Sequence, residues 1–440
     1  MSELRPYQAD AIERVQGAFR AGARSVLLQM PTGAGKTHTA AGGLIAPTVT
    51  RGRRVIFAAH LEEILLDTAQ RLARAGLPVG IVKSGHPSDP HAPVQVASTP
   101  TLARMIERSD AMPDADRVIL DEAHRAASSM NRAVLAYYRD RGARILGLTA
   151  TPSRGDEQPL DEFEHLVCGP SVRELIADGA IMRAEVFAPA RVLERGVARD
   201  PVELVLSDRT DRRVVIFAPD GAAANSIHER LRAGGYRTET VLDGTPSDVR
   251  RSVRARIASG ETRGIVTVRA VIEGFDAPAL DCAILCGAFT TVAPYLQAIG
   301  RVVRSHPGKA DAIVDDLRGA FYLHGAPDDD RVWSLEGAQG RSVTPHARGL
   351  RRCGACGLMC EPVTRCPHCG STAITDPRPM RVQRAEMFAM STVPVTDRAA
   401  RYVEATERAM VARGMSPGRA AHLARVKAPA WVREALHANQ

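Results

Sequence analysis

The sequence has few aromatic residues and very few lysines. Phe, Trp and Tyr make up 4% of its 440 residues, and Lys36, Lys83, Lys309 and Lys427 are the only lysines among 58 basic residues. A protein that grips single nucleic-acid bases needs aromatic side chains on which those bases stack. The low aromatic content disfavours such a platform, and the scarcity of lysine makes the position of each lysine informative.

A long apolar run is also missing. The longest stretch without a charged residue, residues 282–300, has 19 residues and so reaches the length of a membrane span. It contains Pro294 and Gln297 and divides into a strand, a turn and a helix start, which argues against a transmembrane helix. The first ten residues, MSELRPYQAD, carry an acid and an arginine where a secretory leader would become apolar. We therefore expect a cytoplasmic protein.

Positive charge is concentrated at one end of the chain. Of the 58 basic and 50 acidic residues, 16 and 7 lie after residue 340, so the last hundred residues carry a net charge of +9 and the first 340 carry −1. Such a bias indicates an anionic partner, with nucleic acid the leading candidate. Arginines on a solvated surface would give the same composition, and composition alone does not separate the two.

Strand-like and helical segments alternate along most of the sequence. A length of 440 residues with 45% hydrophobic and 25% charged residues predicts a soluble protein of several domains. Apolar strands alternate with amphipathic helices from residue 25 to about 150, and the rhythm restarts at residue 213. This pattern predicts an α/β fold with two tandem parallel-sheet domains. The expected parts are a first domain at 1–188, a second at 189–340, a linker with a zinc-binding module at 341–375, and a basic helical tail at 376–440.

A glycine-rich loop follows the first expected strand. Residues 31–37 read PTGAGKT. Glycines let backbone N–H groups curve around phosphate oxygens, a lysine neutralises the β- and γ-phosphates, and a hydroxyl holds Mg²⁺ at a helix N-terminus. Met30 stands where the full pattern has glycine, so the match is one residue short. We expect ATP to be bound by Thr32, Gly33, Ala34, Gly35, Lys36 and Thr37, with Thr37 also a magnesium ligand.

Two adjacent acids end a later apolar strand. Residues 118–120 (VIL) lead into Asp121-Glu122-Ala123-His124, a DEAH sequence. At the carboxyl end of a strand, where α/β proteins build ligand sites, Asp121 is placed to hold Mg²⁺ and Glu122 to polarise the attacking water. Alone, these four residues would more often be a solvated helix start. Together with the glycine-rich loop they predict a nucleotide hydrolase.

These segments, in this order, resemble the motifs of the superfamily-2 helicase ATPases. Residues 4–8 (LRPYQ) resemble the adenine-recognition motif, which implies that Arg5 stacks on the base and Gln8 hydrogen-bonds its edge. Residues 58–60 (AAH) and 98–102 (STPTL) resemble nucleic-acid contacts of the first domain. Residues 149–151 (TAT) resemble the segment that links hydrolysis to movement. The resemblance covers about residues 1–320 and implies two RecA-like domains.

The second half carries the rest of the resemblance. Residues 274–278 (GFDAP) and 297–304 (QAIGRVVR) resemble the fifth and sixth motifs, which complete the ATP site from across an interdomain cleft. Arg301 and Arg304 are three positions apart and so share a helix face, from which an arginine stabilises the transferred phosphoryl group. With residues 307–311 (PGKAD) and the cysteines beyond, the chain is most similar to the RadD-like DNA-repair ATPases and their phage-borne relatives. The implied site residues are Gly274, Asp276, Gln297, Arg301 and Arg304.

The fifth motif departs from the family pattern. Val268 and Arg269 stand where a polar pair is usual, which puts the nucleic-acid contact of that strand in doubt. Arg269 is itself able to reach a phosphate.

Five of the eight cysteines lie within 17 residues. Cys353-x₂-Cys356 and Cys366-x₂-Cys369 form two turns that offer four thiolates to a structural Zn²⁺, leaving no open position for water. A redox pair and inert thiols are the alternatives, and Cys360 and His368 leave the ligand set open. Cys168, Cys282 and Cys286 lie in apolar segments, which fits a reducing cytoplasm.

Three functions fit these motifs. The first is an ATP-driven translocase or helicase acting on DNA in repair, recombination or replication, and associated with the nucleoid when bound. The second is a nucleotide-dependent module that remodels or recruits without unwinding, and the third is the motor subunit of a restriction or defence complex. We expect ATP, Mg²⁺ and structural Zn²⁺ as cofactors and contacts mainly to the phosphate backbone. Residues 413–420 resemble a helix-turn-helix segment, with a plain helical cap as the alternative.

Overall fold

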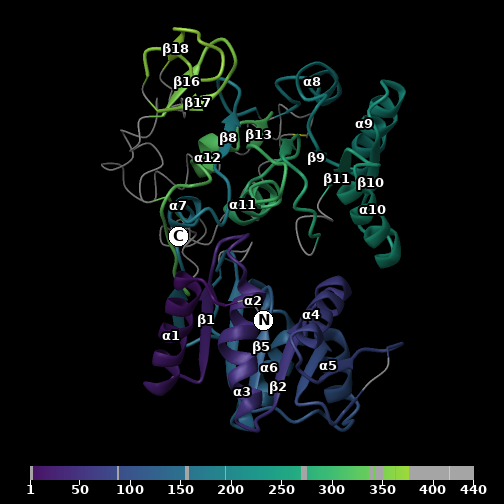
Figure 1. Cartoon of the computed structure of the whole chain (residues 1–440), viewed down its shortest axis with the longest axis vertical. Coiled ribbons are helices and arrows are strands. Elements are labelled where there is room, and N and C mark those ends of the chain that lie inside the picture. Colours follow the sequence, from purple (N-terminus) through teal and green to yellow (C-terminus); the bar gives the residue numbers. More distant parts are fainter. Residues whose placement is uncertain are drawn as a thin grey trace. The chain divides into compact units, whose positions relative to one another are not determined.

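The computed structural model describes residues 3–86, 89–153, 158–193, 195–268, 275–336, 341–342, 350–361, 363–375 and 416 (Figure 1). The chain divides into two units, Met1–Pro377 and Arg378–Gln440. The fold below is that of the first unit. The predicted helical tail and its helix-turn-helix-like segment lie outside the described residues, except for Ser416.

The first domain is built on a seven-stranded sheet in the order β3-β4-β2-β5-β6-β1-β7, and its described pairings are parallel. Short apolar runs buried on both faces explain why the central strands read as continuous hydrophobic segments. The strands are β1 Ser25–Gln29, β2 Val55–Ala59, β3 Val79–Val82, β4 Val94–Ser98, β5 Arg117–Leu120, β6 Arg144–Thr149 and β7 His165–Cys168.

Helices cover both faces of this sheet (Figure 1). One buried cluster joins α1, η1 and α4 to residues such as Leu28 and Phe57, and a second joins α5 and α6 to residues such as Leu27 and Ile56. Neighbouring strand residues therefore point to opposite layers, as the period of a strand requires. The helices are α1 Pro6–Arg20, α2 Lys36–Ala40, the π-helix η1 Ala41–Ile45, α3 Ala46–Thr50, α4 Glu62–Arg74, α5 Thr99–Glu107, the 3₁₀-helix η2 Ala123–Arg125, α6 Ser129–Asp140 and α7 Val172–Ala177.

The second domain has a six-stranded sheet in the order β10-β11-β9-β12-β13-β8, again with parallel pairings. Its edge strand β8 precedes residue 189, so the second sheet takes up chain that the sequence pattern assigned to the first domain. Residues 189–210, which precede the restart of the strand and helix pattern at residue 213, include a helix that packs on this sheet. The elements are β8 Ala184–Phe187, α8 Pro201–Asp208, β9 Val214–Phe217, α9 Gly221–Ala233, β10 Thr238–Val241, α10 Ser247–Ser259, β11 Gly264–Thr267, β12 Cys282–Leu285, α11 Val292–Ile299, β13 Ala312–Asp316 and α12 Phe321–His324.

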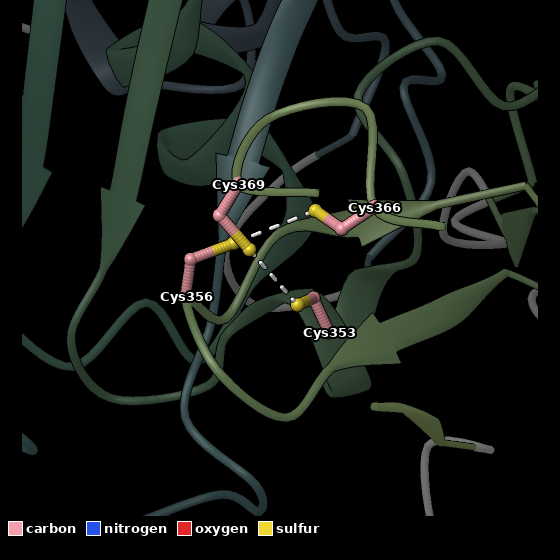
Figure 2. Close-up of side chains that lie close together, drawn as sticks. All are labelled: Cys353, Cys356, Cys366 and Cys369. Atoms are coloured by element: carbon pink, nitrogen blue, oxygen red, sulfur yellow. Dashed lines mark hydrogen bonds between the residues drawn. The ribbon is translucent and has the colours of Figure 1, made fainter. Parts of the chain in front are cut away.

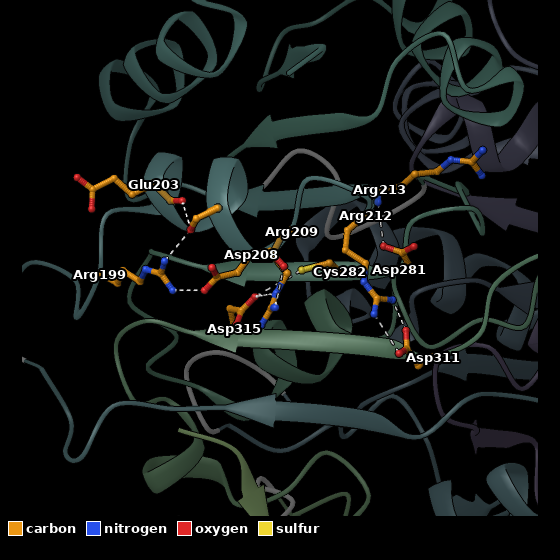
Figure 3. Close-up of polar contacts among 11 residues, drawn as sticks. Arg199, Glu203, Asp208, Arg209, Arg212, Arg213, Asp281, Cys282, Asp311 and Asp315 are labelled. Atoms are coloured by element: carbon orange, nitrogen blue, oxygen red, sulfur yellow. Dashed lines mark hydrogen bonds and ion pairs between the residues drawn. The ribbon is translucent and has the colours of Figure 1, made fainter. Parts of the chain in front are cut away.

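An ionic network fastens α8 and the turn after it to this sheet (Figure 3). Arg209 donates from Nε and Nη2 to the two carboxylate oxygens of Asp315, both at 2.9 Å, and both side chains are buried. The Sγ of Cys282 lies 3.6 Å from the same carboxylate. Because a buried charge is stable only when it is paired, the bidentate pair explains how β13 tolerates an acid in its core.

The cysteine module pairs with the edge of the second sheet. Its strands β16 Arg351–Cys353, β17 Met359–Cys360 and β18 Ile374–Thr375 form a small antiparallel sheet. The backbone N–H of Ala188 donates to Gly357 at 3.1 Å, and Nε of Arg352 donates to the carbonyl of Ala188 at 2.8 Å. The module therefore covers backbone groups that the edge strand β8 would otherwise expose. A further short pair, β14 Arg331–Val332 and β15 Arg341–Ser342, precedes it.

Candidate functional site

The phosphate loop connects β1 to the start of α2. Gly33 and Gly35 have φ of +90° and +81°, values that side-chain-bearing residues rarely adopt. At Gly35 a Cβ would also lie 2.8 Å from Nε2 of Gln8, so the close approach as well as the turn requires glycine. Lys36 donates from Nζ to the carbonyl of Met30 at 3.3 Å. Burial lowers the pKa of Lys36, and the nearby charges of Glu122 and Asp121 oppose that shift.

The predicted adenine-recognition residues support this loop from behind. Gln8 is buried and donates from Nε2 to the carbonyl of Ala34 at 3.1 Å, while its Oε1 accepts from the backbone N–H of Arg5 at 3.0 Å. The Arg5 guanidinium pairs with Asp178 at 2.9 Å. In this structure the amide of Gln8 thus holds the phosphate loop.

The acidic pair stands where β5 ends, beside the phosphate loop. Asp121 is buried, and burial together with the charge of Glu122 raises its pKa. Burial also opposes ionisation of Glu122, but the contact with His124, whose Nδ1 lies 3.4 Å from Oε2, keeps the pKa of Glu122 low. Glu122 has φ +48°, a left-handed conformation that costs a non-glycine residue energy and is concentrated at functional sites. The contact with His124 and the left-handed backbone thus distinguish Glu122 from Asp121.

His124 also connects the acids to residues 149–151. Its Nδ1 lies 3.4 Å from Oγ1 of Thr149, which in turn donates to the carbonyl of Thr151 at 3.0 Å. Gln29 on β1 donates from Nε2 to the carbonyl of Ala150 at 3.0 Å. The segment predicted to couple hydrolysis to movement is thus bonded to both the acidic motif and the strand that carries the phosphate loop.

The second domain contributes α11 and the residues that follow it. Arg301 is buried and donates from Nη1 to the carbonyl of Phe275 at 3.0 Å, while Arg304 pairs with Asp276. Asp276 also pairs with Arg71 of α4 at 3.3 Å, which joins the two domains. Gly300 packs so closely against the phosphate loop that a Cβ there would lie 2.5 Å from Cβ of Thr32. Glycine is needed at 300 because the two domains touch there.

These residues line one pocket of about 390 Å³. The pocket contains eleven of the residues that the sequence predicted for the ATP site. Arg5, Gln8 and Ala34 are predicted site residues that do not line it, and Gly274 lies outside the described residues. The predicted residues that line it are Thr32, Gly33, Gly35, Lys36, Thr37, Asp121, Glu122, Asp276, Gln297, Arg301 and Arg304.

The donor set of this pocket fits a magnesium nucleotide. Backbone groups at a helix start, one lysine and two arginines suit phosphate oxygens, and the hydroxyl of Thr37 with the carboxylate of Asp121 suits Mg²⁺. Sequence reasoning missed Arg71, which lines the pocket, and His124, which neighbours Glu122. Arg71 has no local signal because its partner is 205 positions away. His124 did have a signal in the sequence, because it is the last residue of the DEAH motif at 121–124.

The two Cys-x₂-Cys turns bring four sulfur atoms together (Figure 2). The Sγ atoms of Cys353, Cys356, Cys366 and Cys369 all lie within 4.8 Å of one another. The pairs Cys353–Cys369 and Cys356–Cys366 are each separated by 3.6 Å. Four thiolates around a tetrahedral zinc ion lie ~3.8 Å apart, given Zn–S bonds of ~2.3 Å, so the cluster fits structural zinc.

The structure narrows the ligand set that the sequence left open. The cluster of four does not include Cys360, which is buried in β17 among apolar residues. The His368 ring packs edge-on against Phe187 of β8, with ring centroids 5.0 Å apart, and so serves the contact with the second domain.

Comparisons with known proteins match both domains. The family model for the res subunit of type III restriction enzymes matches residues 1–154, and the model for the helicase conserved C-terminal domain matches residues 198–306. A Saccharomyces cerevisiae protein named as the ATP-dependent helicase IRC3 is 24% identical over 361 residues, which cover 72% of this chain and 52% of the relative. The chain is a superfamily-2 helicase ATPase. It spans about half the length of the yeast relative.

Solved structures share the fold of this superfamily-2 chain. A fragment named as the HsdR subunit of a type I restriction enzyme from Vibrio vulnificus superposes with a TM-score of 0.57 at 21% identity, over 76% of this chain and 70% of that one. Dbp5 of S. cerevisiae, bound to RNA and ADP BeF3, superposes with a TM-score of 0.51 at 15% identity, over 71% and 88%. At these identities the likeness shows a shared two-domain fold. Within the described part of the chain, no helix has the length and apolar character needed to cross a bilayer.

Proposed function

We propose that this helicase ATPase is a motor that moves along DNA, acting in repair, recombination or replication. The observation that carries the proposal is the single pocket in which Lys36 and Glu122 of the first domain face Arg301 and Arg304 of the second. A site divided between two domains can couple each cycle of binding and hydrolysis to opening and closing of the cleft. Backbone phosphates suit such stepping because they repeat without regard to sequence.

The pocket residues divide the work by position. Bound MgATP supplies the γ-phosphoryl group whose transfer to water drives the cycle. Lys36 and the backbone N–H groups of the phosphate loop bind phosphate charge, and Thr37 and Asp121 are placed to hold Mg²⁺. Glu122 lines the same pocket and is placed to accept a proton from the attacking water.

The second domain completes this site across the cleft. Arg301 and Arg304 present guanidinium groups to the charge that develops on the phosphoryl group. Gln297 lies one helical turn before Arg301 and lines the same pocket, where it can orient water or phosphate. Asp276 lies between Arg304 and Arg71 and so sets the position of Arg304. We also propose that zinc at the four cysteines stabilises the module on β8 without taking part in hydrolysis.

DNA is preferred over RNA as the track because of the RadD-like arrangement of motifs alone, since the basic last hundred residues suit the phosphates of either nucleic acid. The decisive experiment compares ATPase rates with single-stranded DNA, duplex, forked DNA and RNA, using Glu122→Gln as the inactive control. We expect DNA to stimulate kcat more than RNA does. Equal or greater stimulation by RNA would contradict the choice of DNA. A strand-displacement assay with and without ATP then separates unwinding from a recruitment role.

A motor subunit of a restriction complex is a second candidate. It is favoured by the match of residues 1–154 to the res-subunit model and by the likeness to an HsdR fragment. This alternative requires a partner that carries a nuclease. Purification of the tagged protein from its native cell, followed by assay for ATP-dependent DNA cleavage, decides between the two: cleavage that copurifies supports the restriction motor.

A further inference from the structure

Lys309 makes three contacts outside the nucleotide pocket. Its Nζ donates to the carbonyls of Leu280 at 2.8 Å, Arg304 at 2.9 Å and Val302. An ammonium group has three donors, and these carbonyls use all of them. The chain has 54 arginines and only four lysines, so a lysine at this position is informative. The compact ammonium group can donate in three diverging directions, which the planar guanidinium group of arginine cannot do.

The three carbonyls belong to the two segments that carry the second domain's site residues. Val302 and Arg304 lie in the turn after α11, and Leu280 ends the segment that begins with Phe275 and Asp276. Lys309 therefore joins the backbone around Arg304 to the backbone beyond Asp276. The carbonyls after α11 also lie at the negative end of that helix, which favours a cation.

The contact is made at an energetic cost. Burial lowers the pKa of Lys309 to about 8, with Asp281 opposing the shift and Arg304 adding to it. A partly buried ammonium beside an arginine is unfavourable unless its hydrogen bonds are needed.

We propose that Lys309 is a positioning residue that fixes the turn after α11 so that Arg301 and Arg304 point at the phosphoryl group. This inference rests on the proposed ATP-cleft mechanism. It predicts that loss of Lys309 weakens stabilisation of the transition state, while the affinity of the first domain for nucleotide stays unchanged.

The test is a double-mutant cycle. Lys309→Met, which keeps the chain length but has no donors, should lower kcat by ~10²-fold, the cost of a small misplacement, with the KM for ATP nearly unchanged. In an Arg304→Ala background the same change should cost less than about threefold, because the two residues act as one unit. Binding of ADP with aluminium fluoride should weaken while binding of ADP does not. Lys83→Met removes a lysine that pairs with Glu62 at 3.4 Å in the first domain and serves as the control.

Two outcomes overturn the inference: a kcat for Lys309→Met within about twofold of wild type, or losses that multiply in the double variant. If the Met variant does not fold, Lys309→Gln, which keeps two N–H donors, replaces it in the same cycle. Failure of Arg304→Ala itself to lower kcat would instead refute the cleft mechanism.

A separate observation concerns the amino-terminal ends of two central strands of the first sheet, β5 and β6. The guanidinium groups of Arg117 and Arg144 lie 5.4 and 5.6 Å from the centroid of the Phe19 ring, at the starts of neighbouring strands β5 and β6. Burial, followed by the charges of Arg144, Arg51 and Arg53, lowers the pKa of Arg117 to about 10. Its Nε is buried without a hydrogen-bond partner in the described structure. We define these four residues, Arg51, Arg53, Arg117 and Arg144, as the arginine cluster.

The geometry points to the arginine cluster as a second contact for the phosphate backbone of DNA. Adjacent strands place Arg117 and Arg144 side by side at the backbone, ~4.8 Å apart, and both guanidinium groups lie beside the Phe19 ring. Of the charges that act on Arg117, Asp116 alone is negative and contributes least. Its carboxylate already accepts from the backbone N–H of Arg54 at 2.8 Å. An anion would relieve the mutual repulsion of the cluster. This inference rests on the proposal that DNA is the track.

The test uses Arg53→Ala/Arg144→Ala, two exposed positions away from the nucleotide pocket. Duplex DNA affinity should fall, and the slope of log K against log salt should flatten by ~1 to 2, with kcat at saturating DNA unchanged. Arg199→Ala/Arg230→Ala removes two ion-paired arginines of the second domain as the matched control. A slope equal to that of the control would overturn the cluster as a DNA contact, as would equally tight binding of polyglutamate by wild type. Failure of the wild type to bind DNA would refute the proposed track instead.

Discussion

The nucleotide pocket and the cysteine cluster are assembled in opposite ways. The four sulfur atoms come from 17 consecutive residues, whereas Lys36 and Arg304 of the pocket are separated by most of two domains. The cysteine cluster offers four ligands and no open position, which suits a structural metal. The pocket remains open between two sheets and depends on their approach. A closed local site stabilises a fold, while a divided site can convert ligand binding into domain movement.

The contacts of each site follow from this difference. Around the pocket, several side chains are bonded to partners in the same domain: Gln8 to the phosphate loop, His124 to Glu122 and Thr149, and Lys309 to the turn after α11. The contact between domains includes the Asp276–Arg71 and Arg254–Asp67 ion pairs and the close packing of Gly300 on Thr32. Each half of the pocket is thus held together within its own domain, and ion pairs between the domains join the two halves.

Arg304→Ala should show most clearly that the pocket depends on both domains. An arginine supplied across a cleft contributes ~10³–10⁵-fold to phosphoryl transfer, so kcat should fall by at least ~10³-fold. ATP affinity should stay near normal, because the phosphate loop lies in the first domain. Steady-state ATPase rates and a nucleotide titration measure the two quantities. Arg256→Ala, which removes an arginine paired with Glu239, is the control, and a similar loss in both variants would contradict the role of Arg304.

Glu122→Gln should have the next largest effect, because loss of a general base lowers kcat by ~10²–10⁴-fold. The amide cannot accept the proton from water, but it keeps the shape of the side chain, so ATP should remain bound. Lys36→Ala should lower both the rate and the affinity, since it removes phosphate-binding charge. A filter-binding assay with labelled ATP separates the two behaviours. Glu229→Gln, an exposed position on α9, is the control, and a residual rate above about a tenth for Glu122→Gln would exclude it as the base.

The features that could be predicted from the sequence are those formed by residues close together in the chain. The phosphate loop, the acidic pair and the four cysteines each lie within a few residues, and the structure brings each group together. The central strands were also predictable, because burial on both faces leaves continuous apolar runs. These features need no knowledge of distant partners.

What the sequence did not reveal depends on distant partners. Strand β13 reads AIVDD, and its two acids are tolerated because Arg209 pairs with Asp315 while backbone N–H groups after the strand donate to Asp316. Edge strand β8 has only four residues, and its partner in the cysteine module, Leu358, lies far along the chain from Phe187. The second sheet therefore began earlier than the pattern indicated. Arg71 was missed for the same reason.

Substitutions of the cysteines test whether the cysteine cluster is a local structural site that is separate from the nucleotide pocket. Purified protein should contain one zinc per chain, and Cys369→Ser and Cys353→Ser should both lose it, while Cys360→Ser should keep it as the control. ATPase activity should largely survive Cys369→Ser because that residue is exposed. Cys353 is buried in the cluster that includes the core of the second domain, so its substitution should also lower the Tm. Elemental analysis and thermal denaturation measure these effects, and metal-free wild-type protein would refute the zinc site.

The smallest expected effect concerns the basic tail. Truncation after residue 340 removes a net charge of +9, but it also removes the module that pairs with β8. Truncation after residue 375 keeps the module and removes 11 basic and 6 acidic residues, a net charge of +5. Because each phosphate contact contributes ~0.9 to the slope of log K against log salt for duplex DNA, the shorter truncation should flatten the slope while basal ATPase activity stays unchanged. An unaltered slope would show that the arginines of the tail are exposed to solvent and do not contact DNA. A loss of basal ATPase activity would show that the tail is needed for the fold of the two motor domains.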